Sequence, residues 1–163
     1  MTTKRLAPLA AAGAVAATAA LAAAGTGGAA GTRTTAETLQ IQAKLTTRAE
    51  VPAPKSAKGG KGSFTGLVTA MSKSTGKITW RLSFSGLSGP ATAAHIHLGK
   101  AGTAGAVLIP LCGPCKNGQS GNAMLSAKAI TAIKTGKAYV NVHTAANPGG
   151  EIRGQLGAKS GGM

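Results

Sequence analysis

Acidic side chains are scarce in this sequence of 163 residues, which has three glutamates, no aspartate and 18 lysines and arginines. Glycoside hydrolysis needs two carboxylates close together, but Glu151 is the only acid after Glu50. A serine triad is not supported, because the chain has no GxSxG nucleophile elbow. The shortage of oxygen ligands also argues against a hard-cation site. We therefore assign no catalytic residues.

The N-terminus has the layout of a signal peptide, because Lys4 and Arg5 precede a long apolar stretch over residues 6–24 and small residues follow. We predict a signal peptide over residues 1–30, cleaved between about residues 24 and 31. No transmembrane anchor is expected, because the stretch is mostly alanine and a spanning helix needs roughly 20 strongly apolar residues. The remaining chain has the size of one domain, which we expect to be a secreted, extracellular monomer.

Aromatic residues are also few, while the formal net charge of +15 predicts affinity for polyanions. The densest cationic group, Lys55, Lys58 and Lys61, has no interleaved aromatic residues that could stack on bases. Because we expect the protein to be exported, nucleic acid is the least expected of the possible polyanionic partners. We expect the partner to be an extracellular protein or an anionic envelope polymer, and the sequence does not choose between them.

Alternating apolar and polar residues, the pattern of strands with one buried face, recur along the chain and are clearest at residues 78–84. Further strands are expected at residues 39–45, 64–71, 92–99, 106–111, 139–144 and 151–156. One short helix is expected between Ser126, as its N-cap, and Gly136. The few aromatic residues are expected in the core.

This pattern predicts an all-β fold, an antiparallel β-sandwich or barrel with Greek-key links of the immunoglobulin or superoxide-dismutase type and one short helix. The domain is expected to span residues 37–157, with an exposed connection over residues 48–62. A flexible tail is expected over residues 158–163.

Only two cysteines are present, Cys112 and Cys115, in the sequence LCGPC. An exported chain meets an oxidising environment, which favours a local disulfide. The alternative is a redox pair, because CGPC is also the motif of thioredoxins, where it opens a helix. The following KNGQSGN is typical of a loop rather than a helix, so we favour a structural disulfide.

Two sequence blocks, TAAHIHLGKAGTAGAVLIPL and YVNVHTAANPGGEIRGQL, resemble the signature blocks of CHRD domains, the module repeated in chordin. The earlier EVPAP and ITWRLSFSGLSG fit the same family in order, so the resemblance covers Leu39 to Leu156. It implies an exported module, found in chordin and as a single domain in bacterial proteins, with a mostly undefined role. In chordin the module is associated with the binding of bone morphogenetic proteins. We expect a non-catalytic binding or matrix- or envelope-associated module.

The three histidines all lie inside these blocks. His95 and His97 are two residues apart on a predicted strand, so their Cα atoms should be roughly 6.5 Å apart on one face. With His143 they could bind one copper or zinc ion, and Glu151 could add an oxygen ligand. The alternative is that the histidines hydrogen-bond to backbone groups of glycine-rich loops.

A metalloprotein is therefore the alternative function, with superoxide-dismutase-like chemistry as its minor form. Dismutases also carry a HxH pair and a later histidine on a β-sandwich, but three histidines cannot build both a bridged copper and a zinc site. Asn141, Glu151 and Arg153 complete the closing block. We expect Glu151 and Arg153 to form an ion pair that is partly buried or that contacts Asn141 or His143.

Overall fold

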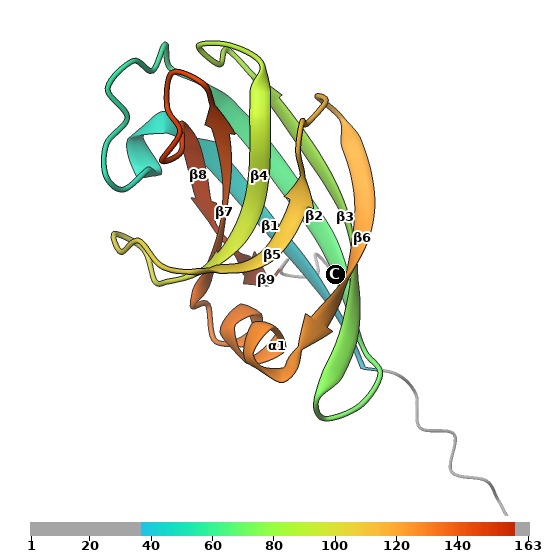
Figure 1. Cartoon of the computed structure of the whole chain (residues 1–163). Helices are drawn as coiled ribbons and strands as arrows, with labels where there is room; N and C mark the ends of the chain where they lie inside the picture. The colour runs from blue at the N-terminus through green and yellow to red at the C-terminus, as the bar shows by residue number, and fades with distance from the viewer. Residues whose placement is uncertain (1–36, 159–163) are drawn as a thin grey trace, which may run out of the picture. The chain divides into compact units, whose positions relative to one another are not determined.

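The computed structural model describes residues 37–158, which form nine strands and one α-helix (Figure 1). The strands are β1 Thr38–Thr46, β2 Lys61–Ala70, β3 Thr75–Ser85, β4 Ala91–Leu98, β5 Val107–Cys112, β6 Gln119–Ser126, β7 Ala138–Thr144, β8 Ile152–Gln155 and β9 Gly157–Ala158. The helix α1 covers Ala127–Lys134, and a short 3₁₀ turn covers Thr47–Ala49. The predicted signal peptide and the end of the tail lie outside the described residues.

The strands form one antiparallel sheet in the order β5-β4-β7-β8-β1-β2-β3-β6, with β9 added beside β1. The chain leaves β3 for β4, yet β3 pairs with β6 and β4 pairs with β7. These crossings are the Greek-key links predicted from the sequence. The two end strands, β5 and β6, come close to each other, so the sheet curls into a nearly closed barrel and the predicted all-β class is confirmed.

The inner face of the barrel carries the large apolar residues that the alternation predicted. Phe64 on β2 and Trp80 on β3 stack inside it with their ring centroids 6.4 Å apart. The predicted helix is also confirmed: Ser126 is its N-cap, and its side chain accepts a hydrogen bond from the backbone N–H of Ala129. Within the described residues, no helix is long and apolar enough to cross a membrane.

Two strands differ from the sequence predictions. Residues of the KNGQSGN segment, predicted as a loop, begin strand β6, which pairs with β3 along its whole length. Gly121 sits opposite Trp80 in this pairing, and a Cβ on Gly121 would lie 2.5 Å from the indole ring. Gly121 is therefore required by the close approach of the Trp80 ring to strand β6, and it does not form a turn. Gly157 and Ala158, expected at the boundary with the tail, pair with β1 as β9.

Replacing Gly121 by alanine tests this packing. The added methyl group must displace the Trp80 ring, so we expect the free energy of unfolding to fall by about 1–3 kcal/mol, the usual range for overpacking. Gly89→Ala is the matched control, because a Cβ at Gly89 meets no atom within 4 Å. Urea unfolding followed by Trp80 fluorescence measures both. Equal stability of the two variants would contradict the packing argument.

Candidate metal centre

The pairing of β4 with β7 determines where the histidines lie. In its register His95 is opposite Asn141, His97 is opposite Tyr139, and His143 is opposite Ala93. Residues directly opposite each other share a face of an antiparallel pair, so all three imidazoles stand on one face. The alternate residues, such as Ile96, are fully buried in the core.

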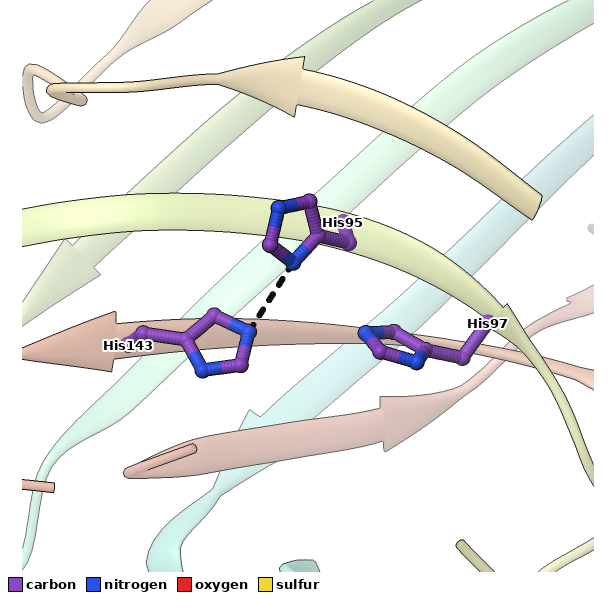
Figure 2. Close-up of side chains that lie close together, drawn as sticks. All are labelled: His95, His97 and His143. Atoms are coloured by element: carbon purple, nitrogen blue, oxygen red, sulfur yellow. Dashed lines mark hydrogen bonds between the residues drawn. The ribbon is translucent and has the colours of Figure 1, made fainter. Parts of the chain in front are cut away.

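The three imidazoles form a close cluster (Figure 2). One ring nitrogen from each of His95, His97 and His143 lies within 4.8 Å of the others. The Nδ1 of His95 is 3.0 Å from the Nε2 of His143, the contact drawn as a dashed line in Figure 2. His97 and His143 are 8% and 9% exposed, and His95 is half-buried. The predicted convergence of the histidines is therefore present in the structure.

Two backbone carbonyls fix the tautomers of two rings. The Nδ1–H of His97 donates to the carbonyl of Gly105 at 2.9 Å, and the Nδ1–H of His143 donates to the carbonyl of Pro148 at 2.9 Å. A carbonyl can only accept, so each Nδ1 carries a proton, and in the neutral imidazole Nε2 then keeps its lone pair. This outer hydrogen bond is the arrangement that orients histidine ligands in metal sites.

The Nε2 atoms of His97 and His143, here called the inner nitrogens, have few other hydrogen-bond partners. The Nε2 of His97 is buried without a hydrogen-bond partner among the described residues. The Nε2 of His143 must accept from the Nδ1–H of His95, because its own lone pair is free. A proton therefore sits between two of the three nitrogens. A metal ion could take its place once His95 carries its ring proton on Nε2 instead.

The protein environment favours the uncharged form of two of these imidazoles, those of His95 and His143. Burial lowers the pKa of His95, and the neighbouring His143 and His97 lower it further. Burial also lowers the pKa of His143, and this outweighs the opposing hydrogen bond to the carbonyl of Pro148. A neutral imidazole is the form that binds a metal. His95 and His143 are thus ready to act as ligands at neutral pH.

Tyr139 and Gly105 hold His97 in place. The Tyr139 ring stacks on the imidazole with centroids 5.0 Å apart, and its hydroxyl accepts the backbone N–H of Gly105 at 3.2 Å. A Cβ at Gly105 would overlap the carbonyl oxygen of Leu98. This glycine is therefore required for the close approach of the loop, a role that the sequence analysis did not assign to it.

The sequence matches the profile of the CHRD domain over residues 41–156. The chain belongs to the CHRD-domain family. The resemblance predicted from the two signature blocks is thus confirmed, and all three histidines lie within the matched region. No curated protein and no solved structure gives a significant match to this chain.

Glu151 of this CHRD domain does not join the histidines. Its fully buried carboxylate accepts hydrogen bonds from the backbone and hydroxyl of Ser88, from the Thr144 hydroxyl and from the Asn147 amide. Burial by itself raises the pKa of Glu151, but these four hydrogen bonds outweigh it and lower the pKa overall. The carboxylate ties the β7–β8 turn to Ser88, in the connection between β3 and β4.

The ion pair predicted between Glu151 and Arg153 is wrong. Glu151 precedes β8, which begins at Ile152, so the alternation that would place the two side chains on one face does not extend to it. Arg153 instead donates to the carbonyls of Lys100 and Thr103, and its guanidinium lies 3.4 Å from the centroid of the Tyr139 ring. Glu151 and Arg153 are more deeply buried than the predicted partial burial, at 0% and 1% exposure.

Glu50 is a buried acid that the sequence analysis left without a role. It is 4% exposed, and one carboxylate oxygen has no hydrogen-bond partner in the described part of the chain. Burial raises the pKa of Glu50, and the lowering effects of the Val51 backbone N–H and the Arg153 charge do not cancel this. A side chain on Gly150 would meet this carboxylate and the Asn141 amide, so a glycine is needed there.

The two cysteines form the predicted disulfide. Cys112 at the end of β5 is bonded to Cys115, with their Cα atoms 5.2 Å apart. The backbone N–H of Cys115 donates to the carbonyl of Ala91, the first residue of β4. The bond therefore closes a short loop beside the strand that carries His95 and His97, and it favours the structural reading over a redox pair.

The opposite pKa shifts of the two buried glutamates predict opposite effects of neutralising them. Glu151→Gln should lower the free energy of unfolding at pH 7 by about 1.5–3 kcal/mol, the range for hydrogen bonds to a charged group. Because the folded pKa of Glu151 is lowered, its stabilising effect is present above the unfolded pKa of about 4.3 and is lost as the pH falls below it.

Glu50→Gln is the matched control. The raised folded pKa of Glu50 means that this residue costs stability as the pH rises above about 4.3, so the variant should be as stable as the native protein at pH 7, or more so. Urea unfolding across the acid and neutral range measures both variants. A loss of stability at pH 7 that is as large for Glu50→Gln as for Glu151→Gln would contradict these assignments.

Proposed function

We propose that this chain is an exported, non-catalytic CHRD module that binds one copper or zinc ion through His95, His97 and His143. The observation that carries the proposal is the pair of backbone carbonyls, of Gly105 and Pro148, that fix the outer nitrogens of two rings. These contacts leave two inner lone pairs directed at one space, which the third histidine also lines.

The kinds of donor atom support a transition metal. The cluster offers three imidazole nitrogens and, within residues 37–158, no carboxylate. Imidazole suits zinc and copper, whereas calcium and magnesium need several oxygen ligands. A fourth position would remain for water or another small ligand, as in other three-ligand zinc sites.

Small movements of the side chains would complete such a site. Nitrogen ligands at about 2.05 Å in tetrahedral geometry are roughly 3.4 Å from one another, whereas the nitrogens here are up to 4.8 Å apart. The nitrogens of His95 and His143 are already 3.0 Å apart. Binding would also require the ring proton of His95 to move from Nδ1 to Nε2, because a neutral imidazole keeps one N–H. Protonation of the imidazoles competes with the metal, so the affinity should fall as the pH falls.

Export is supported by two independent features. The sequence of residues 1–30 has the layout of a signal peptide, and the disulfide between Cys112 and Cys115 is stable in oxidising compartments. An extracellular location also fits the CHRD domain, which is typically found outside the cell. An exported site would take its metal from the envelope or the surrounding medium.

Elemental analysis of the exported protein, purified without a histidine tag and exposed separately to copper and zinc, tests the metal site. We expect close to one equivalent of one of the metals, and its loss in the triple His→Ala variant. His95→Ala alone should also lose most of the metal, and it is the least disruptive change because His95 is the least buried of the three.

Lys128→Ala serves as the control, because this exposed residue of α1 lies outside the cluster and the variant should keep its full equivalent of metal. Circular dichroism shows whether each variant is folded. Dismutase-like chemistry would additionally require the ion to be copper and to change its oxidation state, which a superoxide assay of the loaded protein detects. A folded native protein that takes up neither metal would overturn the proposal.

A further inference from the structure

The outer face of the sheet formed by β1, β2, β3 and β6 is basic and rich in hydroxyl and amide groups. Its cations come from all three long strands and are Lys44 on β1, Lys61 on β2, and Lys77 and Arg81 on β3. We call these four residues and the outward side chains between them the basic face. Along the sequence these cations are scattered, and only the strand pairing brings them to one surface.

The side chains between the cations lie in cross-strand rows. One row contains Gln42, Thr65, Arg81 and Ser120, and the next contains Gln40, Leu67, Thr79 and Asn122. A third contains Lys44, Ser63 and Ser83. These rows offer hydroxyl, amide and cationic groups, with Leu67 and Met124 as the exposed apolar exceptions on the face.

No carboxylate opposes these cations in the described part of the chain. Glu50 and Glu151 are buried, at 4% and 0% exposure. Glu37 is exposed, but it pairs with Lys134 of α1 at 2.8 Å. The basic face therefore has no acidic group of its own to neutralise it, and its charge is available to a partner.

Two shallow depressions cross this face. One is lined by Gln40, Leu67, Thr79 and Arg81, among others. The second is lined by Lys44 and Lys61 together with serines of β2 and β3. Each depression therefore places at least one cation beside neutral hydrogen-bonding groups, an arrangement that suits a chain of alternating acidic and hydroxyl groups.

We propose that the basic face binds an acidic polysaccharide. Its cations would contact the carboxylates of the polymer, and its threonine, serine, glutamine and asparagine side chains would hydrogen-bond the sugar hydroxyls. Single-stranded nucleic acid is disfavoured because its recognition relies on aromatic stacking. Of the aromatic side chains on β1, β2, β3 and β6, Phe64 and Trp80 are in the core, and Phe84 is partly buried against it and lines the second depression. This binding does not depend on the histidine cluster.

The test uses the exported, tag-free protein and polygalacturonate as the immobilised carboxylate polymer. The face variant replaces Lys44, Lys61, Lys77 and Arg81 by glutamine. The control variant replaces four exposed cations elsewhere, Lys55, Lys100, Lys128 and Lys137, by glutamine, so that both variants lose the same charge. We expect the face variant to bind about tenfold or more weakly and the control variant to change much less.

Several outcomes would overturn the proposal. Equal weakening of both variants would mean that net charge alone drives retention. Equal binding to neutral dextran would exclude recognition of acidic groups, and binding to duplex DNA or to a polyphosphate but not to polygalacturonate would indicate a different partner. We expect the triple His→Ala variant to bind the polymer as the native protein does. The polymer result can then be judged whether or not the histidines bind a metal. Loss of polymer binding in that folded variant would contradict independence of the two sites.

Discussion

The antiparallel pairing of β4 with β7 is the constraint on which the candidate site depends. It places Ile96 and Val142 in the core and turns His95, His97 and His143 to the other face. A shift of one residue would exchange the two faces and place the histidines, instead of the aliphatic side chains, in the apolar core. The energy that fixes the register is therefore the burial of the apolar residues, and the position of the imidazoles is its consequence.

The β4–β5 loop and the β7–β8 turn then convert three nearby histidines into an ordered cluster. Gly105 and Pro148 lie in these two connections, and each directs one carbonyl to an outer ring nitrogen. The buried carboxylate of Glu151 ties the second connection to Ser88. The acid expected as a ligand thus contributes from a distance, by fixing the turn that orients His143.

Most strands of the fold could be predicted from the two-residue period, because alternating apolar and polar side chains specify a strand regardless of which strand it pairs with. Strand β6 was missed because Gly121 is explained only by the Trp80 ring opposite it. The shared face of His95 and His97 could be predicted from their spacing. Hydrogen bonds from the histidines to backbone groups of glycine-rich loops were the predicted alternative, and two of them are present. Which carbonyls accept them, those of Gly105 and Pro148, could not be predicted, since a backbone carbonyl leaves no signal in the identity of its residue.

The scarcity of acidic residues affects ligand binding at the two candidate sites in opposite directions. A basic face without carboxylates attracts a polyanion over a range of about one Debye length, roughly 8–10 Å at physiological salt. The same positive field disfavours a metal cation near the domain, so ion binding at the histidines must come from short-range ligation by neutral nitrogens. The two affinities should therefore respond oppositely to salt, because screening weakens the attraction of the face and relieves the repulsion at the cluster.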